Sequence, residues 1–188
     1  MRSVVASLAL LGGFALAAPA PARAADGCTV LLCLAGNWRN ISQCVPPVRE
    51  VLRDLLRGRA FPTCAMGGGS YAAGTGAGNR GVSIAECPGP YLSETYYDGT
   101  FTGYVCNLNG VIDVTVKGQL WSKTYWDGAG NSITEYTAAA KTQLGDGNYD
   151  TAFDEAMAAW RQTPAFEAWN CRINQVCPPP PPETGGGA

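Results

Sequence analysis

Apolar positions near the start of the chain follow two helical patterns, separated by a short polar connection. Residues 28–35 are apolar on nearly every side and lie between Asp26 and Gly36, which predicts a short, buried helix with an acidic start and a glycine stop. A second, amphipathic helix is predicted over residues 46–58. Its apolar positions are Val48, Val51, Leu52 and Leu55. Because the connection is short, we expect residues 25–64 to form an antiparallel αα-hairpin.

The middle of the chain carries short runs of β-branched and aromatic residues. These runs are residues 101–106, 111–116, 119–126 and 132–137. Glycine-containing turns separate them at hairpin spacing, which predicts an antiparallel β-meander. By alternation along a strand, Trp121 and Tyr125 are expected on one face and Trp126 on the other. A sheet covered on one side only would leave one of these sets exposed to a protein or a glycan.

Two helices are predicted after the strands. Asp150 or Thr151 caps the first of them, whose apolar stripe is formed by Phe153, Ala156, Met157 and Trp160. The second follows Pro164 and turns Phe166 and Trp169 inward. The predicted fold class is therefore α+β, and residues 87–177 form one globular domain of meander and C-terminal helices.

Two segments contain too much glycine or proline to supply a core. Residues 65–86 begin with a glycine-rich stretch and are expected to form a loop. Residues 76–81 match the dinucleotide-binding pattern G-x-G-x-x-G, but no buried strand precedes the pattern, so we interpret it as part of this loop. Residues 178–188 predict an extended, then flexible, tail. A spacer is the simpler interpretation of the tail, and a proline-rich ligand is the alternative.

Residues 1–24 have the three parts of a cleavable signal peptide. Arg2 supplies positive charge, residues 4–18 are almost wholly apolar, and residues 22–24 offer small side chains for cleavage. The apolar run is shorter than the roughly 20 residues that span a bilayer. We therefore expect export from the cytoplasm and no transmembrane segment after cleavage, with lipid attachment at Cys28 as a minor alternative.

The charge balance argues against nucleic acid as a partner. The chain has 13 Lys and Arg against 15 Asp and Glu, a formal net charge of −2. Loss of Arg2 and Arg23 with the signal peptide makes the remainder more acidic. Binding of nucleic acid through bulk electrostatics requires a basic surface, so we expect no direct nucleic-acid contact.

The eight cysteines of an exported chain are expected to form disulfides rather than metal sites or nucleophiles. In an antiparallel hairpin, the end of the first helix lies beside the start of the second, so Cys33 is expected to pair with Cys44 and Cys28 with Cys64. A bridge between Cys28 and Cys33 is disfavoured because their spacing puts them on different faces of one helix.

The other four cysteines are expected to pair within the second half of the chain. A bridge between Cys87 and Cys106 would tether the entrance of the meander. Cys171 and Cys177 are close enough in sequence to bridge each other and tie off the C-terminal end.

The chain contains no histidine, which removes the usual general base. What remains for hydrolysis is a carboxylate pair or a Ser–Lys arrangement. Glu86 and Glu94 are the least implausible pair for cleaving peptidoglycan, but nothing in the pattern marks them out among the acidic residues. We therefore predict a protein that is not an enzyme, without catalytic residues, metal or cofactor.

Arg49, Arg53 and Arg57 form a basic stripe on the second predicted helix and are candidates for docking an acidic partner. Glu50 and Asp54 precede two of these arginines by three positions. Local ion pairs on a solvated helix face are therefore the simpler interpretation.

The segment from Cys28 to Cys64 resembles the TrbM family of conjugal-transfer proteins, also called KikA. It carries CTVLLCLAG and then CVPPVREVLRDLLRGRAFPTC behind a signal peptide, and the family has a short CxxxxCL-type helix, a further cysteine and an amphipathic helix that ends near another cysteine. The resemblance implies an exported accessory protein of plasmid conjugation or type IV secretion. It implies no catalytic residues.

We therefore expect a periplasmic accessory protein that works by binding envelope components of a conjugation or secretion apparatus. The first alternative is a protein that binds or cleaves peptidoglycan. The second is a secreted, disulfide-rich binding protein unrelated to conjugation.

Overall fold

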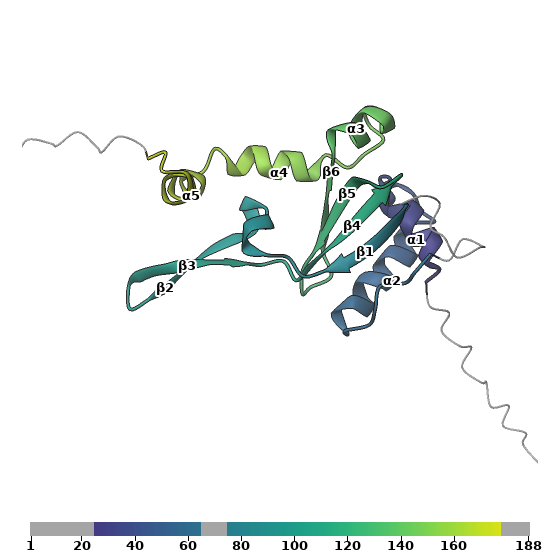
Figure 1. Ribbon diagram of the computed structural model, residues 1–188, viewed down its shortest axis with the longest axis horizontal. Coiled ribbons are helices and arrows are strands. Elements are labelled where there is room, and N and C mark those ends of the chain that lie inside the picture. The colour runs from purple at the N-terminus through teal and green to yellow at the C-terminus, as the bar shows by residue number, and fades with distance from the viewer. Residues whose placement is uncertain (1–24, 65–74, 178–188) are drawn as a thin grey trace, which may run out of the picture.

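The computed structural model has an α+β architecture and describes residues 25–64 and 75–177 (Figure 1). A body of sheet and helices forms one end of the molecule. The part that we call the arm extends away from it and consists of a two-stranded hairpin, residues 92–106, and two helices, residues 152–174. The predicted signal peptide (1–24), the first part of the predicted glycine-rich loop (65–74) and the predicted tail (178–188) lie outside the described residues.

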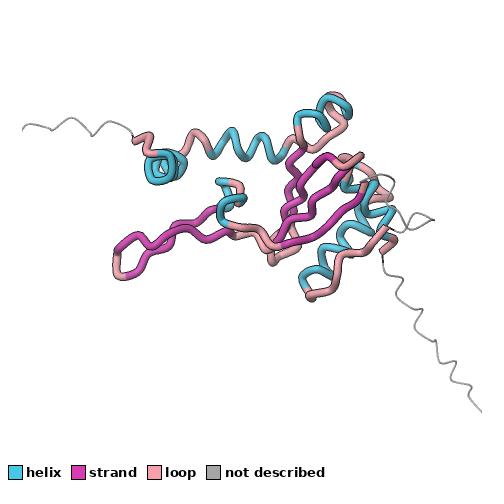
Figure 2. Tube along the Cα trace, viewed as in Figure 1, coloured by secondary structure: helices cyan, strands magenta, loops and turns pink. Residues whose placement is uncertain are grey.

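The sheet of the body is antiparallel, with the strand order β1-β4-β5-β6. Its strands are drawn in magenta in Figure 2. Its strands are β1 (Gly76–Arg80), β4 (Gly110–Val116), β5 (Gln119–Trp126) and β6 (Ser132–Tyr136). The last three strands follow one another in the chain and pair as neighbours. This part of the predicted meander is confirmed.

Helices α1 (Gly27–Leu34) and α2 (Val45–Leu56) cover one face of this sheet as the predicted αα-hairpin. Disulfides join Cys28 to Cys64 and Cys33 to Cys44, in the nested arrangement that the hairpin predicts. The shared core consists of Val30, Leu34, Val48, Val51 and Leu52 from the helices and Ile112, Val114 and Trp126 from the sheet.

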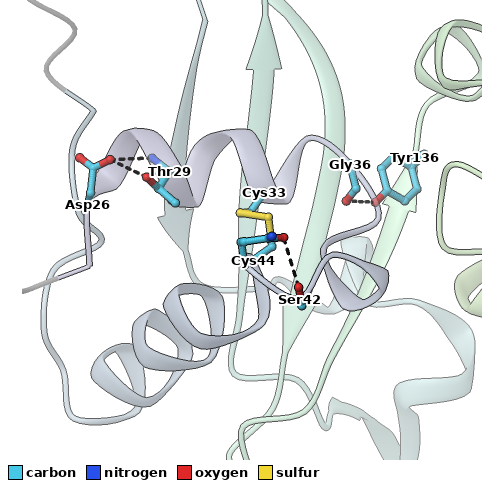
Figure 3. The surroundings of a disulfide bond; sticks show 8 residues. Asp26, Thr29, Cys33, Gly36, Ser42, Cys44 and Tyr136 are labelled. Carbon is cyan, nitrogen blue, oxygen red and sulfur yellow. Dashed lines mark hydrogen bonds between the residues drawn. A yellow bond between two sulfur atoms is a disulfide. The ribbon is translucent and has the colours of Figure 1, made fainter.

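Asp26 caps the N-terminus of α1 (Figure 3). Its carboxylate accepts hydrogen bonds from the backbone nitrogen of Thr29 at 2.9 Å and from the Thr29 hydroxyl at 2.7 Å. These bonds lower the pKa of Asp26. The helix therefore starts at the acidic residue from which the sequence predicts it to start.

The connection between α1 and α2 is held at both ends and against the sheet (Figure 3). The Cys33–Cys44 disulfide closes it, and the Tyr136 hydroxyl donates a hydrogen bond to the Gly36 carbonyl oxygen at 2.7 Å. Burial raises the pKa of Tyr136, so its hydroxyl keeps the proton that it donates. The connection contains the short 3-10 helix η1 (Trp38–Asn40).

The opposite face of the sheet has a second, smaller core. It consists of Val111, Tyr125 and Ile133 from the strands together with Leu108. Helix α4 (Ala152–Trp160) packs on this face, and the Phe153 ring stacks on Tyr125 with the ring centroids 6.0 Å apart.

The predicted facing of the aromatic residues in β5 is wrong for Trp121. The register of β4 and β5 shifts after Val114 and leaves Trp121 as the extra residue of a β-bulge. The bulge reverses the alternation, so Trp121 packs on the helix side, where its Nε1 donates to the Ala35 carbonyl oxygen at 2.7 Å. Tyr125 lies on the other face.

The prediction of a loop for residues 65–86 is wrong at residues 76–80, which form the edge strand β1 on β4. Glycine and alanine give little strand signal, but the backbone still pairs, and polar contacts fix the end of the strand. Asn79 Oδ1 accepts from the Nε1 of Trp126 at 2.8 Å. The Nε of Arg80 donates to Asp113 at 2.7 Å. The short 3-10 helix η3 (Ile84–Glu86) follows.

The prediction of one continuous meander is wrong at its first strand. Strand β3 (Thr100–Cys106) pairs with β2 (Leu92–Tyr97), which the sequence patterns do not predict, and the two form a separate sheet. The edge of β4 that a meander would offer to β3 is occupied by β1. The Cys87–Cys106 disulfide ties the base of this hairpin, beside the 3-10 helix η4 (Gly89–Tyr91).

The two predicted C-terminal helices are confirmed as α4 and α5 (Pro164–Asn174). Asp150 accepts a hydrogen bond from the backbone nitrogen of Ala152 at 3.0 Å, and Thr163 caps α5. Helix α3 (Ala138–Leu144) was not predicted. The Cys171–Cys177 disulfide closes the end of α5.

Candidate partner-binding arm

The hairpin β2–β3 reverses direction at Asp98 and Gly99, both of which have positive φ values, 47° and 74°. Two consecutive left-handed residues give a two-residue turn whose twist matches that of the strands. Tyr97 and Thr100 are the last pair of the hairpin before this turn, and the turn is the free end of the arm in Figure 1.

A β-bulge in the hairpin determines the face on which its aromatic side chains lie. The register shifts between Thr95 and Tyr96. On one face, Phe101 lies edge-to-face against both Tyr96 and Tyr104, with centroid distances of 5.9 Å and 5.2 Å. These three rings form an aromatic row along the hairpin.

Arg172 of α5 joins the helix to this aromatic row. Its guanidinium carbon lies 4.1 Å from the Phe101 ring centroid, and it forms an ion pair with Glu94. Hydrogen bonds from Tyr96 and the positive charge of Arg172 lower the pKa of Glu94. The contact of α5 with the hairpin therefore combines a cation–π interaction with an ion pair.

The arm exposes large apolar side chains. Tyr96, Tyr97 and Val105 are 55%, 79% and 45% exposed. Every residue of β2, β3, α4 and α5 is at least partly exposed, whereas the body holds two clusters of buried residues. Two-stranded hairpins are only marginally stable on their own. The arm is thus an incompletely buried part of a protein whose other end is well packed.

The predicted basic stripe is exposed on α2. Arg49, Arg53 and Arg57 all lie on the solvent side of the helix. Asp54 pairs with Arg57 at 3.6 Å and with Arg59 at 3.0 Å, so part of the stripe is neutralised locally. Its docking role stays a prediction.

The structure gives Glu86 and Glu94 separate cationic partners. Glu86 binds Arg80 at 2.6 Å and lies 3.8 Å from Lys123, while Glu94 belongs to the arm and binds Arg172. Hydrogen bonding to Arg80 lowers the pKa of Glu86. A general acid at neutral pH needs a raised pKa, so this geometry does not supply the acid of a carboxylate pair.

Within residues 25–64 and 75–177, no group of three or more metal-ligating side chains is placed to hold a metal ion. In the same part of the chain, no helix has the length and apolar character needed to cross a membrane.

The four disulfides fit a protein of an oxidising compartment outside the cytoplasm. Comparison with protein-family models, with curated proteins and with solved structures found no match.

Sequence reasoning did not find the arm as a site. The exposed pair Tyr96 and Tyr97 precedes Asp98-Gly99, and a D-G dipeptide next to aromatic residues is a hairpin signal.

Proposed function

We propose that this protein is an exported accessory factor of plasmid conjugation or type IV secretion, and that it binds an envelope protein of that apparatus through its arm. The binding surface is the free end and outer side of the hairpin, around Tyr97. The protein acts by binding, without chemistry of its own.

One observation carries the binding role: the arm exposes Tyr96, Tyr97 and Val105, whereas the body holds two clusters of buried residues. Exposed apolar surface on a projecting element favours a protein partner that covers it. Tyrosine is enriched in the parts of interfaces that contribute most to affinity.

The resemblance to the TrbM family in residues 28–64 supports the conjugation setting. The disulfides support an oxidising compartment, the predicted signal peptide supports export, and the resemblance makes the periplasm the expected compartment. The arm lies outside the segment that carries the resemblance, so the two parts of the proposal rest on different residues.

Transfer frequency in conjugation-competent cells tests the proposal. Deletion of the gene should reduce plasmid transfer, and the wild-type chain should restore it. Tyr97→Ala should restore transfer at least about tenfold less well, as expected for a residue that contributes strongly to an interface. Leu32→Ala is the matched control, because Leu32 is 67% exposed but lies on the body.

Site-specific photo-crosslinking separates the possible outcomes. A crosslinker at position 97, but not at position 32, should capture a protein of the transfer apparatus. Undiminished transfer after deletion would exclude the conjugation role. Turnover of purified peptidoglycan by the wild-type chain would favour the first alternative instead.

The arginine stripe is tested in the same assay. The double variant Arg49→Glu/Arg53→Glu should retain the fold, because both side chains are exposed on α2. Full transfer by this variant would show that Arg49 and Arg53 are not needed for partner binding.

A further inference from the structure

A polar pocket lies between the connection of the αα-hairpin and the turn that leads into α4. Its volume is about 310 Å³, at the low end of the range of small-molecule sites, about 300–1,000 Å³. The side chains that line it are Asn37, Arg39, Asn40, Tyr149, Asp150 and Thr151. It lies on the body, and none of these residues belongs to the arm.

The pocket is held in shape by covalent and polar contacts. The Cys33–Cys44 disulfide encloses the segment that carries the two asparagines. Arg39 spans the pocket walls, because its Nη1 donates to Asp150 at 2.7 Å and its Nη2 bonds to Ser132. A binding site fixed before the ligand arrives loses less conformational entropy on binding.

The charges of the pocket cancel. The Asp150 carboxylate accepts from Arg39 through Oδ2 and from the backbone nitrogen of Ala152 through Oδ1. The Arg39 guanidinium and the Asp150 carboxylate thus neutralise each other. A charged ligand would have to break this pair, whereas a neutral ligand would not.

The remaining polar groups are open to a ligand. Among the described residues, the side-chain amides of Asn37 and Asn40 and the Tyr149 hydroxyl make no hydrogen bond to another protein group. Each carboxamide both donates and accepts, as does each hydroxyl of a sugar. The Tyr149 ring adds an apolar surface, of the kind that the C–H groups of a sugar ring contact.

We propose that this pocket binds a neutral saccharide. The two asparagine amides would bind its hydroxyl or acetamido groups, and Tyr149 would contact the ring. The inference does not rest on the proposed function, since it uses a different surface and a different class of ligand.

The test is an NMR titration of the mature protein with the neutral trimer of N-acetylglucosamine. Backbone amide signals of residues 37–40 and 147–151 should shift, and those of the hairpin 92–106 should not. Asn37→Ala and Asn40→Ala should each weaken binding by about 3- to 10-fold, the usual effect of losing one hydrogen bond. Asn174→Ala is the matched control, because Asn174 lies on exposed α5.

Absence of shifts in these two segments at millimolar trimer would overturn the proposal. Binding that both asparagine variants retain in full would also overturn it. An equal response to the sulfate ion would show that the pocket does not prefer neutral ligands, which would also overturn the proposal.

Sedimentation with purified peptidoglycan sacculi identifies the source of the saccharide. Co-sedimentation that Asn37→Ala reduces would show that the pocket binds a sugar within the polymer. Trimer binding without co-sedimentation would show that it binds a free sugar. Tyr97→Ala should leave both readouts unchanged, so that failure of the arm and failure of the pocket are distinguishable.

Discussion

Trp160 packs so closely against Gly89 that a β-carbon at position 89 would lie 2.2 Å from its ring. The same indole also contacts Phe166 and Trp169 of α5, with centroid distances of 5.0 Å and 5.4 Å. One tryptophan at the end of α4 thus joins the base of the hairpin to α5. Together with the Arg172 contact, this joint connects α5 to the hairpin.

Gly89→Ala should displace the Trp160 ring and loosen the arm. Overpacking of this kind costs about 1–3 kcal/mol. Hydrogen exchange followed by mass spectrometry should show faster exchange in α4 and α5 and unchanged exchange in β4. Gly36→Ala is the control, since a β-carbon there meets nothing within 4 Å. Equal exchange in both variants would show that the joint is not at Gly89.

Arg172→Ala should separate α5 from the hairpin. The variant loses the contact with Phe101 and the ion pair with Glu94. We expect several-fold faster amide exchange in β2, β3 and α5, with the body unaffected. Arg161→Ala, an exposed arginine just after α4, should leave all three segments unchanged. Arg172→Lys should restore little of the protection, because lysine lacks the planar group that stacks on an aromatic ring.

The disulfide pairing and the helical hairpin could be predicted because both depend on local spacing. Apolar positions every third or fourth residue define α2, and antiparallel helices place Cys33 beside Cys44. The pairing of Cys171 with Cys177 also followed from short sequence separation. Such contacts need no knowledge of the tertiary arrangement.

Contacts between segments far apart in the sequence could not be predicted in the same way. Strand β1 takes the edge of β4 although its sequence is GAGNR, and that choice excludes β3 from the main sheet. Trp121 changes face through a single extra residue, which no alternation pattern shows. The saccharide pocket unites Asn37 with Tyr149, residues far apart in the chain that only the packed sheet brings together.

Leu52→Ala should destabilise the body strongly. Leu52 is 1% exposed, in the core between α2 and the sheet, and truncation of a buried leucine costs about 2–5 kcal/mol. Leu56 on the same helix is 38% exposed, so Leu56→Ala should cost less than about 1 kcal/mol. Urea unfolding monitored by circular dichroism measures both. Similar losses for the two variants would contradict the assigned burial of α2.

Acidification should lower the free energy of unfolding, in part through protonation of Glu86. Its pKa is lowered in the folded state by hydrogen bonds from Arg80, so the folded protein favours the carboxylate more than the unfolded chain does. The resulting stability is present above the unfolded pKa, about 4.3 for glutamate, and is lost as pH falls through the lower folded value. Glu86→Gln should therefore show a smaller decrease in unfolding free energy between neutral and strongly acidic pH. An unchanged pH dependence would mean that the Arg80 pair does not contribute.

Removing the Cys33–Cys44 disulfide should reduce both stability and saccharide binding. The bridge closes a loop with a sequence separation of 11 residues, and loops of this size typically gain about 2–4 kcal/mol from cross-linking. The enclosed segment carries Asn37 and Asn40, so the double variant Cys33→Ser/Cys44→Ser should also weaken trimer binding in the NMR titration.

The Cys171–Cys177 bridge is the matched control for this effect. It has a sequence separation of 6 residues and lies at the exposed end of α5, remote from the core of the body. Cys171→Ser/Cys177→Ser should therefore leave urea unfolding of the body and trimer binding nearly unchanged. If both double variants lower the stability of the body equally, the Cys33–Cys44 bridge has no special role in fixing the α1–α2 connection. If only Cys33→Ser/Cys44→Ser loses binding, the disulfide stabilises the pocket as well as the fold.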